Sequence, residues 1–125
     1  MSEPTRTVLL VDDDPQMLRL MRAMLGPQNV NVLAAPRPSD ALRICSEETV
    51  DLLISDVSMP EMDGNKLAER VLKLHPRASV LLISGAVSEP PPVKTARVRF
   101  LKKPFFPAEL IRLLREMLAD RAERA

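Results

Sequence analysis

Apolar residues along this chain gather in five short runs, and most of the segments between them have apolar residues at helical spacing. The runs predict β-strands at residues 8–11, 30–34, 52–55, 80–84 and 98–101. The first, third and fourth runs are continuously apolar rather than alternating, which is typical of strands that helices cover on both faces. The pattern therefore favours a parallel sheet.

Helix signals lie between the runs. Asp14 is expected to cap a helix that Pro15 opens. Ser39 is expected to cap a second, short helix, and apolar spacing predicts a third over residues 64–74. A final helix is predicted from Pro107 toward the C-terminus. Strands that alternate with helices form a βα repeat, which right-handed crossovers fold into a sheet between two layers of helices.

The connection between the last two predicted strands does not fit this repeat. It comprises only residues 85–97, and three consecutive prolines, residues 90–92, stand in its middle. Consecutive prolines cannot lie inside a helix, because each lacks an N–H donor and clashes with the preceding turn. We therefore expect an extended loop or a stunted helix here, so that the fourth helix is short or absent.

Composition limits the architecture and the kinds of partner. The 125 residues fit one domain, residues 1–125, and leave no room for a second. Apolar residues make up 46% of the chain but aromatic residues only 2%, so the core must be aliphatic, which suits helices packed on a sheet. The net charge is +1, with acidic and basic residues interspersed. We therefore expect neither direct nucleic-acid binding nor attraction to an anionic membrane.

The sequence favours a cytoplasmic location. Its one cysteine, Cys45, excludes an internal disulfide and agrees with a reducing compartment. Its place among apolar helix positions predicts a small core residue. No apolar stretch approaches the length of a membrane span, and residues 1–7 are too polar for a signal peptide.

Three aspartates follow two of the predicted strands. Asp12 and Asp13 come directly after the first run, and Asp56 directly after the third. If these strands are parallel neighbours, the carboxylates converge at the edge of the sheet where open α/β sheets bind ligands. Two ionised carboxylates about 5 Å apart repel by roughly 3 kcal/mol at an effective dielectric of about 20. The cluster therefore predicts a site for a hard divalent cation.

The same edge carries the groups that phosphoryl transfer requires. Asp56 stands at a strand tip, where its carboxylate can act as a nucleophile. Attack on phosphorus needs the negative charges masked, which a Mg²⁺ held by Asp13 and Asp56 would provide. Lys103 would add a second positive charge and Ser84 a hydroxyl hydrogen bond. Together these residues predict a site that forms and holds an aspartyl phosphate.

Taken singly, several of these polar residues have simpler interpretations. Asp14 suits a helix cap better than a ligand. Gly64 suggests a backbone position with positive φ, and His75 suggests charge–dipole stabilisation at a helix end. Lys103 alone would be a surface lysine, and Ser84 alone a turn residue. A shared site is favoured because four such elements coincide at corresponding strand ends.

Four motifs together resemble the receiver domain of two-component response regulators. They are Val-Asp-Asp-Asp-Pro at 11–15, Ile-Ser-Asp-Val-Ser-Met-Pro-Glu-Met-Asp-Gly at 54–64, Ile-Ser-Gly at 83–85 and Lys-Lys-Pro-Phe at 102–105. The resemblance spans nearly the whole chain. It implies a flavodoxin-like, doubly wound α/β fold with a five-stranded parallel sheet in the order 2-1-3-4-5 and helices on both faces.

By this resemblance, Asp56 would be the phosphoacceptor, which a sensor histidine kinase or a phosphotransfer protein charges from a phosphohistidine. Asp13 would bind Mg²⁺ directly and Asp12 through water, and the backbone carbonyl of Ser58 would complete the protein's share of the metal shell. The domain would catalyse its own phosphorylation and dephosphorylation without being a conventional turnover enzyme.

The resemblance also implies which residues switch. Ser84 would be the hydroxyl that moves onto the phosphoryl group, with Lys103 as its charge partner and a cis peptide between Lys103 and Pro104. Phe100 would be the aromatic residue that follows the hydroxyl inward. Simple packing is the competing interpretation of Phe100, since any strand of an aliphatic core can hold one phenylalanine.

The proline-rich connection leaves the output open. In receiver domains, dimers and output domains dock around the fourth helix, the fifth strand and the last helix, so an output domain, a protein target and a homodimer are all compatible with this chain. It would be either a single-domain regulator or a receiver cut from a larger protein. One alternative is a receiver-like interaction module that works without phosphorylation. Another is a phosphatase-type enzyme with an aspartate nucleophile, although such enzymes typically need a cap domain and a longer chain.

Overall fold

The computed structural model describes residues 5–85 and 97–124. The proline-rich connection predicted over 85–97 lies almost wholly outside the described residues. The elements, in chain order, are β1 (Thr7–Val11), α1 (Pro15–Leu25), a 3₁₀ turn η1 (Gly26–Gln28), β2 (Asn31–Ala35), α2 (Pro38–Glu47), β3 (Leu52–Asp56), α3 (Gly64–Leu74), β4 (Ser79–Ser84), β5 (Val98–Lys102) and α4 (Pro107–Arg124). The five predicted strands are confirmed, with ends shifted by about one residue, as element boundaries commonly are.

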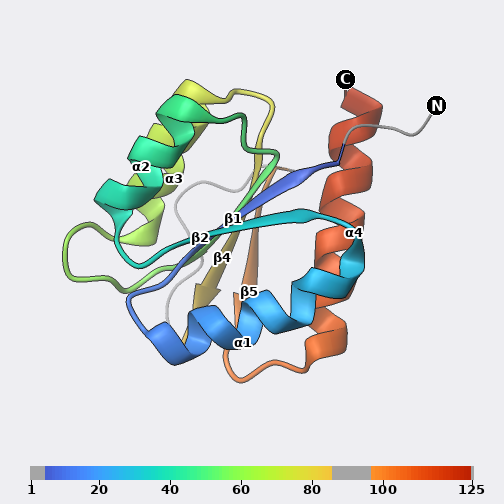
Figure 1. Cartoon of the computed structure of the whole chain (residues 1–125), viewed down its shortest axis with the longest axis horizontal. Coiled ribbons are helices and arrows are strands. Elements are labelled where there is room, and N and C mark those ends of the chain that lie inside the picture. Colours follow the sequence, from blue (N-terminus) through green and yellow to red (C-terminus); the bar gives the residue numbers. More distant parts are fainter. Residues whose placement is uncertain (1–4, 86–96, 125) are drawn as a thin grey trace.

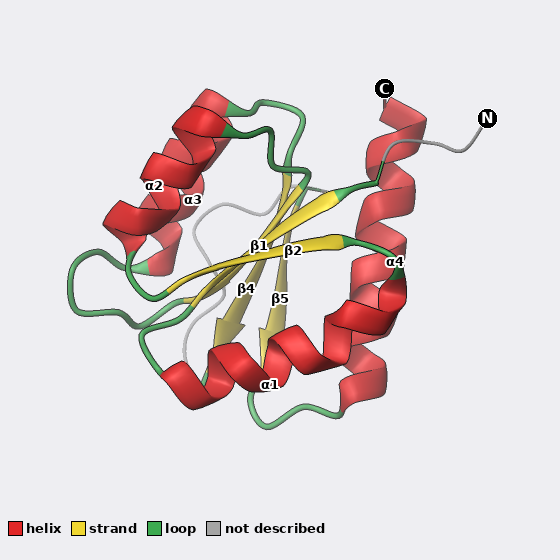
Figure 2. Cartoon of the chain, in the orientation of Figure 1, coloured by secondary structure: helices red, strands yellow, loops and turns green. Residues whose placement is uncertain are grey.

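The strands form one parallel five-stranded sheet in the order β2-β1-β3-β4-β5. Helices α2 and α3 cover one face of the sheet, and α1 and α4 cover the other (Figure 1). The same three layers are visible when the chain is coloured by secondary structure (Figure 2). The predicted flavodoxin-like α/β fold is therefore confirmed.

Two hydrophobic cores explain why the central strands are continuously apolar. Successive side chains of a strand point to opposite faces of the sheet. In β1, Val8 and Leu10 pack in the core beneath α1 and α4, whereas Leu9 and Val11 pack in the core beneath α2 and α3. All four side chains are fully buried, so these successive positions are apolar on both faces of the strand.

Of the two predicted helix caps, Asp14 is confirmed and Ser39 is wrong. The Asp14 side chain accepts a hydrogen bond from the Gln16 N–H at 2.9 Å and caps α1, as expected. The prediction that Ser39 caps α2 is wrong, because Pro38 occupies the first helical position and Arg37 is the N-cap residue, without a side-chain cap bond. Ser39 therefore lies inside the first turn, where its backbone N–H needs an acceptor from elsewhere.

His75 ends α3 and also joins it to α2. Its backbone N–H donates to the carbonyl of Val71 at 2.8 Å, which closes the last turn. Its ring Nε2 lies 2.8 Å from the carbonyl oxygen of Cys45 in α2. The expected position at a helix end is confirmed, and the ring links two helices in addition.

Cys45 is a core residue, as predicted, and its thiol should be nearly inert in the folded protein. Burial raises the pKa of the Cys45 thiol from 9.0 to about 11. Because only the thiolate attacks a disulfide reagent, labelling near neutral pH should be at least about 100-fold slower in the folded than in the unfolded chain. A thiol-labelling time course with and without denaturant measures this ratio, and equal rates would contradict the buried position.

No helix in residues 5–85 or 97–124 is long and apolar enough to cross a membrane.

Candidate functional site

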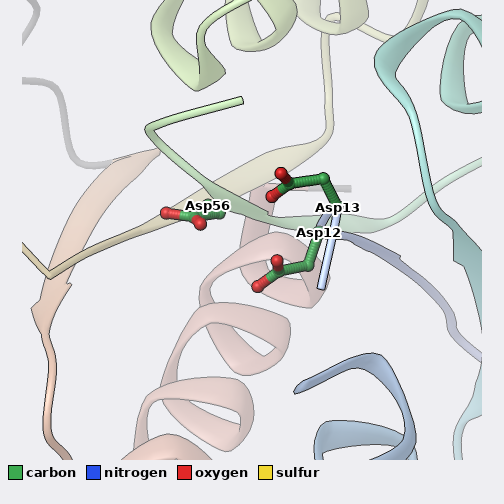
Figure 3. Close-up of side chains that lie close together, drawn as sticks. All are labelled: Asp12, Asp13 and Asp56. Carbon is green, nitrogen blue, oxygen red and sulfur yellow. The ribbon is translucent and has the colours of Figure 1, made fainter. Parts of the chain in front are cut away.

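The three predicted aspartates do meet at one edge of the sheet. Residues Val11 and Ser55 are partners in the parallel register of β1 and β3, so the residues that follow them lie side by side. One carboxylate oxygen from each of Asp12, Asp13 and Asp56 lies within 4.8 Å of the other two (Figure 3). Each carboxylate offers an oxygen to the same small volume, as a cation site requires.

Lys103 reaches the same cluster from the end of β5. Its amine Nζ lies 3.5 Å from Oδ2 of Asp56 and 3.9 Å from Oδ2 of Asp12. The backbone N–H of Lys103 donates to the carbonyl of Ser84 at 2.8 Å, which prolongs the pairing of β4 with β5. The peptide between Lys103 and Pro104 is cis, as expected.

The acidic cluster carries more negative than positive charge. Burial raises the pKa of Asp12, which is 1% exposed, and the nearby Asp56 carboxylate raises this pKa further. Two interactions lower it again, a 2.9 Å hydrogen bond from the Asp14 N–H to Asp12 and the charge of Lys103. One lysine amine, which lies within 3.9 Å of Asp12 and Asp56, thus stands beside a cluster of three carboxylates. An all-oxygen, anionic donor set of this kind fits a hard cation such as Mg²⁺.

The exposed side of the cluster opens into a shallow pocket. Ser58 is exposed on its rim, and its backbone N–H lies 3.4 Å from Oδ1 of Asp56. Asp13 is exposed as well, so solvent and a cation have access to its carboxylate. The pocket has a volume of about 510 Å³ and is lined by Asp13, Val57, Ser58, Met59, Pro60 and Asp63.

The two predicted switch residues lie on neighbouring strands. Ser84 is the last residue of β4 and is buried, one position after Ile83, the register partner of Asp56. Phe100 lies in β5 beside Leu82, is partly buried, and packs against the core beneath α2 and α3. Both the packing role and the switch role predicted for Phe100 are compatible with this position.

Gly64 has a different purpose from the one predicted. None of the described glycines has a positive φ, so the expected left-handed backbone at Gly64 is wrong. Instead, a Cβ atom at this position would stand 2.5 Å from the carbonyl oxygen of Asp56 and 3.0 Å from the Cα of Val57. The N–H of Gly64 donates to the carbonyl of Val57 at 2.8 Å, which draws the start of α3 against the end of β3. Glycine is therefore needed for close approach to the phosphoacceptor candidate.

An apolar pocket next to Lys103 was not expected from the sequence. Its volume is about 490 Å³, and Leu20, which is 51% exposed, forms part of its wall. The pocket is lined by Met17, Leu20, Met24, Gly85, Lys103, Pro104 and Phe105. Two features of the sequence could have indicated this pocket: Leu20 on the polar face of α1, and the Pro-Phe pair that follows Lys103.

The fold and the site define a class: flavodoxin-like α/β proteins with three clustered carboxylates and a lysine at the carboxyl edge of a parallel sheet. Residues 8–115 match the family model described as the response regulator receiver domain. The chain therefore belongs to the response regulator receiver domain family, whose members serve two-component systems. The resemblance drawn from the four motifs is confirmed.

Two relatives by sequence and one solved structure support this assignment. The response regulator receiver protein CpdR of Brucella abortus is 32% identical over 116 residues, covering 90% of this chain and 97% of CpdR. The transcriptional regulatory protein GlrR of Escherichia coli K12 is 36% identical over 107 residues, covering 83% of this chain. The chain spans only 24% of the length of GlrR. The crystal structure of a CheY-like receiver domain protein from Methanospirillum hungatei JF-1 superposes with a TM-score of 0.90 at 25% identity, covering 98% of this chain and 100% of that one.

Proposed function

We propose that this chain is a phosphorylation-activated switch of a two-component phosphorelay and that Asp56 is its phosphoacceptor. The phosphoryl donor would be a phosphohistidine on a sensor histidine kinase or a phosphotransfer protein. The observation that carries the proposal is the meeting of Lys103, at 3.5 Å, and the other two carboxylates around Asp56. We further propose that residues 1–125 act as a single receiver domain in the cytoplasm.

The proposed transfer is a displacement at phosphorus. A carboxylate oxygen of Asp56 forms the new P–O bond while the P–N bond to the donor histidine breaks, and the imidazole leaves with the electron pair of that bond. Asp13, Asp56 and the Ser58 carbonyl would hold Mg²⁺, with Asp12 bound through water. The bound Mg²⁺ would neutralise charge on the phosphoryl oxygens. Lys103 supplies a further positive charge beside Asp56.

The proposed switch follows from the charge that the phosphoryl group brings. An attached phosphoryl group adds nearly two negative charges and several strong acceptor oxygens. The Ser84 hydroxyl would donate a hydrogen bond to one of these oxygens, and Lys103 would pair with another. Phe100 would then move inward behind Ser84. These contacts shift the equilibrium between two conformations only by the difference in their interaction free energy between the two.

The experiment that tests this function is incubation of the protein with acetyl phosphate and Mg²⁺. We expect the wild type to gain the mass of one phosphoryl group per chain, measured by mass spectrometry of the intact protein. Omission of Mg²⁺ should prevent the gain, because the charges of donor and acceptor would then repel without a counterion. Wild-type protein that binds Mg²⁺ but never gains this mass would contradict the proposal.

Asp13→Asn should weaken Mg²⁺ binding by at least about tenfold, because an anionic ligand is replaced by a neutral amide. Titration calorimetry measures the affinity. Asp14→Asn is the matched control, since asparagine caps α1 as well as aspartate does and Asp14 is not proposed as a ligand. Equal Mg²⁺ affinity of Asp13→Asn and the wild type would remove Asp13 from the proposed metal shell.

The alternative function is a receiver-like interaction module that works without phosphorylation. The reason for considering this alternative is the proline-rich segment 90–92, which lies outside the described residues. Under this alternative, Asp56→Asn would leave the affinity for a protein partner unchanged, whereas the phosphorylation switch predicts that the phosphorylated wild type and Asp56→Asn differ. A binding titration with each form distinguishes the two. Multiple turnover on a generic phosphate ester would instead favour the phosphatase-type alternative.

A further inference from the structure

A side chain from the loop after Asp56 supplies the cap that α2 lacks. The N-cap residue of α2, Arg37, makes no side-chain cap bond, and Pro38 at the first helical position has no N–H. The next N–H, that of Ser39, donates instead to Oε1 of Glu61 at 2.9 Å. A carboxylate is well placed at a helix N-terminus, where the unpaired N–H groups and the helix dipole both favour negative charge.

The position of Glu61 in its loop gives this bond a consequence for the site. The loop connects β3 to α3 and is fixed at both ends. At its start, the N–H of Val57 donates to the carbonyl of Ile83 at 2.9 Å, and at its end Asp63 caps α3 through a 2.8 Å bond from the Lys66 N–H. Glu61 lies between these anchors, so its bond to α2 restrains the part of the loop that carries Ser58.

Glu61 does not line the shallow pocket beside Asp13 and Ser58. The loop residues that line it are Val57, Ser58, Met59, Pro60 and Asp63. Glu61 is exposed and binds α2 instead. Its effect on a bound cation must therefore pass through the backbone of the loop rather than through direct ligation.

We propose that Glu61 is a positioning residue, which clips the β3–α3 loop to the start of α2 and thereby holds the Ser58 carbonyl in place for the metal. The role in metal binding rests on the proposed function. The clip itself does not, because it is a hydrogen bond between two groups of the protein. Loss of the clip should leave the fold intact and make the loop more mobile.

The test compares three variants with the wild type. Glu61→Ala removes the acceptor. Glu61→Gln removes the charge but keeps an oxygen that can accept from the Ser39 N–H. Glu48→Ala removes the same charge at the opposite end of α2 and serves as the control. Two quantities are measured for each protein: the Mg²⁺ affinity by titration calorimetry, and the amide hydrogen exchange of Ser39 and of residues 58–62 in metal-free protein by NMR.

We expect Glu61→Ala to bind Mg²⁺ about fivefold more weakly and to exchange these amides faster, as the loss of one hydrogen bond implies. Glu61→Gln and Glu48→Ala should stay within about twofold of the wild type. Equal weakening by Glu61→Ala and Glu61→Gln would overturn the proposal in favour of a simple charge effect. A lower melting temperature of Glu61→Ala with unchanged Mg²⁺ affinity and unchanged loop exchange would also overturn it.

The two measurements separate the clip from the proposed function. A wild type that binds no Mg²⁺ would contradict the proposed metal shell and the part of this proposal that depends on it. The exchange rates of Ser39 and residues 58–62 would still show whether Glu61 restrains the loop. Unchanged exchange in Glu61→Ala would reject the clip whatever the metal result.

Discussion

Asp56→Asn should gain no phosphoryl group from acetyl phosphate and Mg²⁺ under conditions in which the wild type gains one. The carboxylate is the proposed nucleophile, and an asparagine amide at the same place lacks its negative charge and its nucleophilic oxygen. The substitution also removes the ion pair to Lys103. Mass spectrometry of the intact protein measures the gain directly, and a mass gain by Asp56→Asn equal to that of the wild type would contradict the assignment.

The loss should not come from unfolding. Asp56→Asn takes one charge out of a group of three carboxylates and also removes the ion pair to Lys103, so it relieves repulsion while it removes an attraction. We therefore expect a thermal unfolding midpoint close to that of the wild type. Asp14→Asn is the matched control, because asparagine can keep the cap on α1 and Asp14 is not proposed as a ligand. It should take up phosphate as the wild type does.

Gly64→Ala should destabilise the protein by about 1–3 kcal/mol, as overpacking of a tight contact does. The new methyl group would stand 2.5 Å from the Asp56 carbonyl oxygen, and its neighbours are backbone atoms that cannot rotate away. Relief requires a shift of the end of β3 or of the start of α3. Because that shift moves Asp56, we also expect slower phosphorylation of the variant. Urea unfolding and the mass assay measure the two effects.

Gly26→Ala is the control for Gly64→Ala. Gly26 follows α1 with φ −50°, in the right-handed helical region, and no atom lies within 4 Å of the position of its Cβ. Alanine there should be neutral or should stabilise by up to about 1 kcal/mol, since it restricts the unfolded chain. Equal unfolding free energies for the two variants would contradict the close approach at Gly64.

Much of the fold could be predicted from the sequence because its main signal is local. Continuous apolar runs arise wherever both faces of a strand are buried, and β1 shows this directly, with Leu9 and Leu10 in different cores. The strand order was not available from periodicity, and it came from the family resemblance. The meeting of Asp12, Asp13 and Asp56 followed from placing the ends of parallel strands at one edge.

The errors concern residues whose partners are distant in the sequence. Ser39 has the side chain of a helix cap, but Pro38 before it begins the helix and the real acceptor is Glu61, 22 residues away. The sequence suggests a positive φ at Gly64, whereas glycine is needed there because the backbone of Asp56, at the other end of the β3–α3 loop, lies too close for a Cβ atom. Local patterns cannot show such contacts, because the chain must fold before the two parts meet. The apolar pocket beside Lys103 has the same origin, since α1 and the segment after β5 build it together.

The most direct test of the central claim is to locate the phosphoryl group on the wild-type chain. After incubation with acetyl phosphate, reduction with borohydride marks an aspartyl phosphate, and peptide mass spectrometry identifies the marked residue. We predict one mark, at Asp56, that forms with Mg²⁺ and is absent when the metal is chelated. A mark at another residue, or no mark on protein shown to bind Mg²⁺, would contradict the account.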